Sequence, residues 1–158
     1  MRAAVLVLLA AAAAPALAQT FGCTNALKAP TEPAAQAQFS YTVPSGTLAG
    51  VKYDLYYKQK FARTPAGGGA AADLATAYVA GESDSTRHVY RGTATSSVCA
   101  PNAPRPVVQV TYECPDATGI VTAAGAEDSI TAVAEDLAAC LFKVTVQTTR
   151  VCTKIAPA

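Results

Sequence analysis

Few side chains in this 158-residue sequence could carry out chemistry. His88 is the single histidine, and no serine lies in the G-x-S-x-G pattern that presents a nucleophile on a sharp turn. Two pairs of adjacent acids, Glu127-Asp128 and Glu135-Asp136, are the type of residue that cleaves glycosidic bonds. Adjacent acids in an alanine-rich segment are usually solvated, however, and a lone histidine in a strand is usually a core or rim residue. We therefore expect a protein that is not an enzyme.

Cofactor and metal sites lack their usual sequence patterns as well. The run Gly67-Gly68-Gly69 is without the Lys and Ser or Thr of a phosphate-binding loop. Structural zinc sites use closely spaced cysteines, whereas the nearest pair, Cys140 and Cys152, is twelve residues apart. We expect no cofactor and no bound metal.

The five cysteines are the candidates for a covalent framework: Cys23, Cys99, Cys114, Cys140 and Cys152. They follow a segment with the order of a signal peptide, namely Arg2, an apolar run over 3–14 and small residues at Ala16 and Ala18. We expect residues 1–18 to be removed and the mature chain to be secreted or kept in the lumen of the secretory pathway. Disulfides are the default for cysteines in that oxidising compartment.

The charge balance bears on the partners of the protein. Lys and Arg together number 12, and Asp and Glu number 11. This near-neutral balance argues against a nucleic-acid partner or a polybasic membrane surface. No later apolar run approaches the roughly 20 residues of a membrane-spanning helix, so we expect no membrane insertion after signal removal.

Alternating apolar and polar residues predict a mainly β domain. The segments 39–43, 51–58, 108–114 and 140–146 place apolar side chains on one face with a period of two residues, and 86–91 is a further short candidate. We expect a single domain over 38–158, preceded by an irregular segment over 19–37.

Two segments also fit a helix. Residues 70–80 are rich in alanine, and 130–138 carry apolar residues at positions i, i+3, i+4 and i+7. Alanine is common in the whole chain, which weakens the first assignment, and the second stays open between helix and strand.

The predicted strands limit how the last four cysteines pair. Cys140 begins the last strand and Cys152 continues its register, so the two are roughly 40 Å apart in extended chain, at about 3.3 Å per residue. Because they cannot pair with each other, two arrangements stay open: 99 with 140 and 114 with 152, or 99 with 152 and 114 with 140. In the first arrangement each bridge closes a loop of about 40 residues and stabilises the fold by about 4 kcal/mol.

The order of these cysteines and strands resembles the mannose 6-phosphate receptor homology domain, a lectin-like domain of the secretory pathway. The matching residues lie within about 51–152 and are Tyr53-Asp54-Leu55, Tyr90-Arg91-Gly92, Cys99, Arg105, the strand 107–113 with Cys114, and Cys140-Leu141-Phe142 leading to Cys152. The resemblance implies a flattened antiparallel β-barrel or sandwich, with bridges Cys99–Cys140 and Cys114–Cys152. Cys23 is then left as a free thiol, or as one bridged to a partner or a second copy.

Family members that bind mannose use a Gln, an Arg, a Glu and a Tyr, whose donors and acceptors hold the sugar hydroxyls. The resemblance places the arginine at Arg105 and the glutamate at Glu135. The glutamine falls on Gln59, or on Arg63 in another alignment. Phe142 stands where the tyrosine is expected and lacks its hydroxyl, so it fits the core better than a sugar contact.

Two functions follow from the resemblance. The first is a non-catalytic module that binds a glycan or glycoprotein, with mannose-type sugar recognition. The second is a degenerate copy of the same domain that serves as a structural, cargo-receptor or extracellular interaction module without sugar binding. Phe142, the ambiguous position of the glutamine and the unpaired Cys23 motivate the second.

Overall fold

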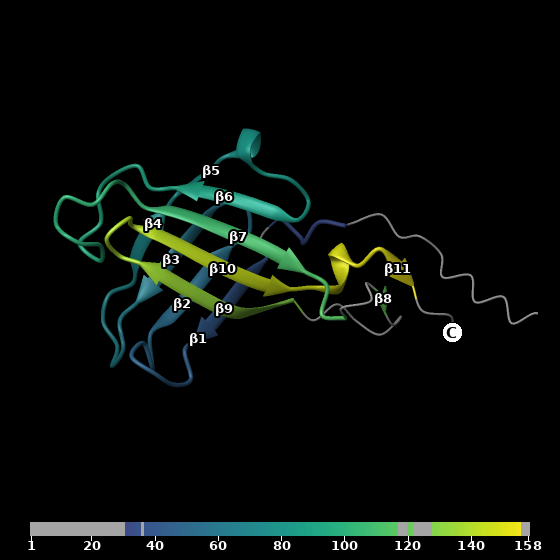
Figure 1. Ribbon diagram of the computed structural model, residues 1–158, viewed down its shortest axis with the longest axis horizontal. Helices are drawn as coiled ribbons and strands as arrows, with labels where there is room; N and C mark the ends of the chain where they lie inside the picture. The colour runs from purple at the N-terminus through teal and green to yellow at the C-terminus, as the bar shows by residue number, and fades with distance from the viewer. Residues whose placement is uncertain (1–30, 36, 117–119, 122–127, 156–158) are drawn as a thin grey trace, which may run out of the picture.

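Two β-sheets pack against each other around one hydrophobic core (Figure 1). The computed structural model describes residues 31–35, 37–116, 120–121 and 128–155. The first sheet has the order β1 (Gln38–Thr42), β2 (Lys52–Tyr56), β3 (Lys60–Thr64) and β4 (Ala72–Ala75). The second has the order β5 (Ala77–Tyr78), β6 (Arg87–Arg91), β7 (Val107–Glu113), β10 (Leu141–Gln147) and β9 (Ser129–Asp136). The mainly β fold is confirmed, and the two sheets do not close into a barrel.

Short elements complete the described part of the chain. β8 (Ile120–Val121) pairs in parallel with β11 (Lys154–Ile155). Two single-turn 3₁₀ helices are η1 (Ala80–Glu82) and η2 (Thr149–Val151). No helix within the described residues is long and apolar enough to cross a membrane. The expected signal peptide, Cys23 and Glu127 lie outside the described residues.

The core is built by the residues whose alternation predicted the strands. Tyr53 and Leu55 of β2 have no exposed surface, and the same holds for Phe142 and Val146 of β10. Val108 and Val110 of β7 are buried beside them. The period of two therefore places one face of each strand in the interior.

Both segments that fit a helix in sequence form strands in the structure. The prediction of a helix over 70–80 is wrong, because this segment forms β4, which pairs with β3, and the short β5. The open segment 130–138 is mostly β9, which pairs with β10 along its length. The register shifts between Thr145 and Val146, so that Ile130 faces Val146 and Ala132 faces Thr145, with Thr131 as the extra residue. This β-bulge puts Ile130 and Val133 on one face, which explains the helix-like spacing of three residues.

One pair of strands departs from the antiparallel arrangement that the resemblance implies. β10 lies between β7 and β9, antiparallel to β9 and parallel to β7, with Leu141 opposite Val107 and Gln147 opposite Glu113. Cys140 directly precedes β10 and bonds to Cys99. Cys114 directly follows β7 and bonds to Cys152. The implied pairing is therefore present, with one disulfide at each end of the parallel pair.

Gly92 lies so close to its neighbours in the fold that no side chain fits at this position. A Cβ atom at this position would lie 2.7 Å from the Leu74 carbonyl oxygen and 2.7 Å from Pro106 Cδ. Gly92→Ala should therefore lower the free energy of unfolding by about 1–3 kcal/mol through overpacking. Gly81→Ala is the matched control, because nothing lies within 4 Å of a Cβ there. Chemical denaturation of both variants checks the prediction, and equal stabilities would contradict it.

Candidate functional site

A polar cluster lies between the two sheets, formed by Tyr53, Arg63 and Glu135 (the Tyr53–Arg63–Glu135 cluster). Tyr53 of β2 and Arg63 of β3 are register partners. The bulge in β9 turns Glu135 toward them, and Glu135 is opposite the buried Phe142 of β10. Tyr53 Oη donates a hydrogen bond to Glu135 Oε1 at 2.6 Å, and Arg63 Nε donates to the same oxygen at 2.7 Å. Three strands from two sheets therefore meet at one carboxylate oxygen.

The cluster is largely withdrawn from solvent. The Glu135 side chain is 4% exposed and the Arg63 side chain 15%. Burial raises the pKa of Tyr53, and its bond to the Glu135 carboxylate raises the pKa further. Burial opposes the charge on Arg63, but the hydrogen bonds and charge interactions with Glu135 and Tyr53 together outweigh burial and raise the pKa of Arg63. The result is a neutral phenol and a charged guanidinium bound to one acid.

Part of the hydrogen-bonding capacity of the cluster is unused. Both of these bonds go to Glu135 Oε1, and the Arg63 side chain also forms a hydrogen bond with Tyr53. Glu135 Oε2 accepts no bond from the described residues. A guanidinium has five N–H donors and a carboxylate about four acceptor positions, so the cluster retains donors and an acceptor for further hydroxyl groups.

Two phenylalanine rings pack beside the cluster. Phe61 stacks on Tyr53 with ring centroids 5.7 Å apart and an interplanar angle of 16°. Phe142 lies 6.3 Å from Phe61 and has no exposed surface. Phe142 thus lies in the core, as its missing hydroxyl favoured, and has no exposed surface to offer a ligand.

Two other candidate residues lie outside the cluster. Gln59 is in the turn between β2 and β3, whereas Arg63 is toward the opposite end of β3, and Gln59 Nε2 donates to the Ala35 carbonyl oxygen at 3.2 Å. Arg105 is exposed in the segment before β7 and forms no ion pair with Glu135 or any other described residue. Of the four residues first assigned, the structure brings only Glu135 into a polar site, together with the alternative candidate Arg63.

Tyr53 was missed as a site residue, because its place in an apolar alternation predicts a core side chain. Arg63 carries a signal that sequence reasoning could have used. It shares a strand face with Phe61, which is fully buried. The charge of an arginine on a buried strand face has to be paired with an acid, and that acid has to come from another part of the fold.

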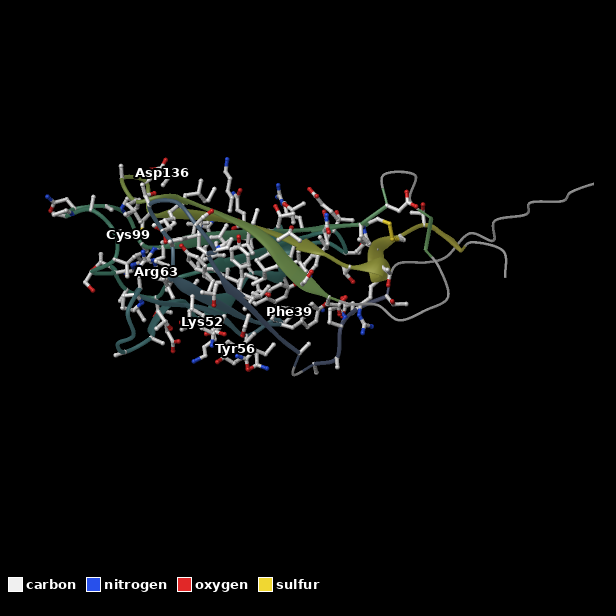
Figure 2. The ribbon with its side chains drawn as sticks, turned by 90° about the horizontal axis from the view of Figure 1, so that it is seen from below. Phe39, Lys52, Tyr56, Arg63, Cys99 and Asp136 are labelled. Carbon is white, nitrogen blue, oxygen red and sulfur yellow. A yellow bond between two sulfur atoms is a disulfide. The ribbon has the colours of Figure 1, made fainter. Side chains whose placement is uncertain are left out.

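The end of the molecule near the cluster is hollowed. Figure 2 shows Arg63 at the same end as Cys99 and Asp136. One hollow lies between β4 and the loop 93–97, lined by hydroxyl-bearing side chains of that loop and by Ala72, the register partner of Arg63. A second lies between the same loop and residues 99–103. No group of three or more potential metal ligands was found in the described part of the chain.

Comparison with known proteins adds no assignment. No family model matches the sequence, and no curated protein is detectably similar to it. What the fold and the site define is a two-sheet, disulfide-bonded β domain with a polar cluster between its sheets.

Proposed function

We propose that this protein is a non-catalytic carbohydrate-binding module of the mannose 6-phosphate receptor homology type, which binds sugar hydroxyls at the Tyr53–Arg63–Glu135 cluster. The observation that carries the proposal is the meeting of a phenol, a guanidinium and a carboxylate at one point. These are three of the four residue types that mannose-binding members of the family use. The disulfide pairing supports the same family, because it matches what the resemblance implies.

The chemistry of the cluster suits a sugar. Neighbouring hydroxyls on a pyranose ring act as donor and acceptor at once, so they are best held by a guanidinium beside a carboxylate. Tyr53 supplies the phenol that Phe142 lacks, but from the other sheet. A ligand would reach the cluster through the exposed part of Arg63, beside the hydroxyl-lined hollow at β4.

Burial of the cluster favours a second candidate function. Because the Glu135 side chain is 4% exposed, its ion pair with Arg63 could serve only to join the two sheets. The protein would then be a degenerate copy of the domain that acts as a structural, cargo-receptor or extracellular interaction module. Both functions place the protein in the secretory pathway, and the two disulfides are compatible with this location.

Binding of mannose-bearing glycans by the full mature chain separates the two functions. Tyr53→Phe keeps the buried ring and removes one hydroxyl, so sugar binding should weaken about tenfold, which corresponds to roughly 1.4 kcal/mol. Isothermal titration with a methyl mannoside and a glycan array measure the effect.

Two variants serve as controls for this binding assay. Tyr56→Phe changes the neighbouring half-buried tyrosine of β2, and Arg105→Ala removes the exposed arginine; both should bind like the unmodified protein. If the folded, unmodified protein shows no mannose-dependent binding, sugar recognition is wrong and the second function stands. If Arg105→Ala alone abolishes binding, the site lies in the loop before β7 and not at the cluster.

A further inference from the structure

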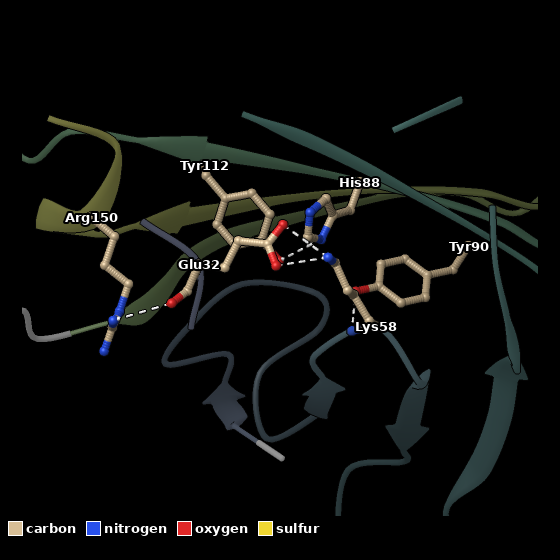
Figure 3. Close-up of polar contacts among 6 residues, drawn as sticks. All are labelled: Glu32, Lys58, His88, Tyr90, Tyr112 and Arg150. Carbon is tan, nitrogen blue, oxygen red and sulfur yellow. Dashed lines mark hydrogen bonds and ion pairs between the residues drawn. The ribbon is translucent and has the colours of Figure 1, made fainter. Parts of the chain in front are cut away.

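A segment preceding β1 crosses the end of the molecule opposite the disulfide Cys99–Cys140. We call residues 31–35 the strap. The Thr31 amide donates to the Arg150 carbonyl oxygen at 3.0 Å, and Arg150 Nη1 donates to the Glu32 carbonyl oxygen at 3.4 Å. Lys58 Nζ bonds both Glu32 carboxylate oxygens at 2.8 Å (Figure 3). The strap is thus fastened to η2 on one side and to the turn after β2 on the other.

A small cavity lies beneath the strap. Its volume is about 10 Å³, which admits one water molecule at most. Glu32 and Pro33 of the strap line it together with Tyr57, His88 and Tyr112. His88 is 2% exposed, and a hydrogen bond of 3.1 Å joins His88 Nδ1 to Tyr112 Oη. The strap therefore lies over the only histidine of the sequence.

The strap is held by weak contacts. None of its residues is buried, and Glu32 is 59% exposed in its ion pair with Lys58. Exposed ion pairs contribute little, and segments without buried apolar side chains open at low cost. Opening would admit water to His88 without disturbing the two sheets.

We propose that the strap is a pH-sensitive closure, which covers His88 while the ring is neutral and lifts when the ring is protonated. The proton is taken up from solvent by an imidazole nitrogen, and the resulting cation is stable only when water reaches it. The closed strap leaves His88 2% exposed, with room for one water molecule at most, so protonation and closure oppose each other.

The charges around His88 agree with this direction. Burial lowers the pKa of His88, and the nearby Lys58 lowers it further, while Glu32 and Asp84 partly offset both. Arg150 lines the same cavity, and its charge is paired with Asp128. The remaining titratable neighbours are tyrosines, namely Tyr57, Tyr78, Tyr90 and Tyr112. Among the described residues no acid forms an ion pair with His88, and Glu32 and Asp84 act on it only through their charge.

Acidification weakens the strap in a second way. The hydrogen bond with Lys58 lowers the pKa of Glu32 in the closed strap. As the pH falls and the carboxylate takes up a proton, the ion pair that stabilises the closed strap is lost. When a group has a lower pKa in the closed strap than in the open one, its contribution to the stability of the closed strap is complete above the ordinary pKa. That contribution is lost as the pH falls below the ordinary pKa. For His88 this loss begins below its ordinary pKa of 6.5, and for Glu32 it begins below 4.5. Both groups favour opening in acid, and His88 titrates first.

Nuclear magnetic resonance of the full mature chain tests the proposal, because a single histidine gives an unambiguous ring signal. The His88 titration and the protection of the Thr31 amide, corrected for intrinsic exchange, are followed from pH 7.5 to pH 4.5. We expect Thr31 protection to fall with the same midpoint as the ring titration. For each unit by which the strap depresses the His88 pKa, opening becomes about tenfold more favourable upon protonation. Unchanged protection of Thr31 through the ring titration would overturn the proposal.

The variant Glu32→Gln gives an independent test through the sign of its effect. If the strap controls access to His88, losing the ion pair opens the strap and raises the His88 pKa toward 6.5. If the strap is passive, removing a nearby carboxylate leaves less negative charge and lowers the pKa instead. Glu82→Gln is the matched control, since it breaks the similarly exposed ion pair with Arg91 away from the strap. A lowered His88 pKa in Glu32→Gln refutes the closure.

Discussion

Replacing Arg63 with methionine should lower the free energy of unfolding by about 3–5 kcal/mol. The substitution leaves the Glu135 carboxylate, whose side chain is 4% exposed, without its cation in the space between the sheets. Tyr53 alone would then bond that acid, and its phenol cannot neutralise the charge. Urea denaturation followed by circular dichroism measures the loss.

The double variant Arg63→Met/Glu135→Leu shows whether the loss comes from the unpaired charge. With both charges removed, most of the stability should return, because a buried ion pair and an apolar pair of similar volume are often nearly equivalent. Arg91→Met is the control, since the Arg91–Glu82 pair has side chains 49% and 45% exposed and should contribute less than about 1 kcal/mol. If Arg63→Met costs no more than Arg91→Met, the cluster does not join the sheets.

The second large effect concerns the disulfide Cys99–Cys140. Replacing both cysteines with alanine should cost about 4 kcal/mol, because the bridge closes a loop with a sequence separation of 41. The bridge Cys114–Cys152, with a separation of 38, should cost about as much. A small domain has a net stability of only about 5–15 kcal/mol, so removing both bridges should leave it largely unfolded at 37 °C. Denaturation with and without a reducing agent measures each contribution.

Peptide mapping of the oxidised protein provides the control for this prediction. It should recover only the pairs Cys99–Cys140 and Cys114–Cys152. If Cys23 is unpaired as expected, Cys23→Ser should leave the free energy of unfolding unchanged. A non-reducing gel shows whether Cys23 links two copies. Disulfide variants as stable as the unmodified protein would mean that the hydrophobic core alone holds the two sheets.

Several strands could be read from the sequence because their signal is local. The alternation in 51–57 and 140–146 depends only on which residues face the core, and it needs no knowledge of the neighbouring strands. The alanine-rich segment 70–80 lacks such a signal, since alanine fits a helix or a half-exposed strand equally well in size. Pairing with β3 makes part of this segment the strand β4 and not a helix.

The candidate site was harder to predict, because its residues come from strands that are distant in sequence. Glu135, a candidate from the sequence, does lie in the cluster, but its partners Tyr53 and Arg63 lie 82 and 72 residues away. The resemblance placed an arginine at Arg105 and the missing phenol at Phe142. The fold instead leaves Arg105 in solvent and Phe142 in the core.

The sequence by itself determined that this is a mainly β domain, and it narrowed the disulfide pairing to two choices, because alternation and cysteine spacing are properties of the chain alone. The tertiary structure decided where Glu135 points. Without the bulge at Thr131, a strict period of two from Ile130 would turn Ala132 and Ala134 inward and Glu135 out to solvent. β9 pairs with β10 on both sides of the bulge, and β10 is itself inserted parallel to β7. That insertion is a contact between distant segments, and no local pattern encodes it.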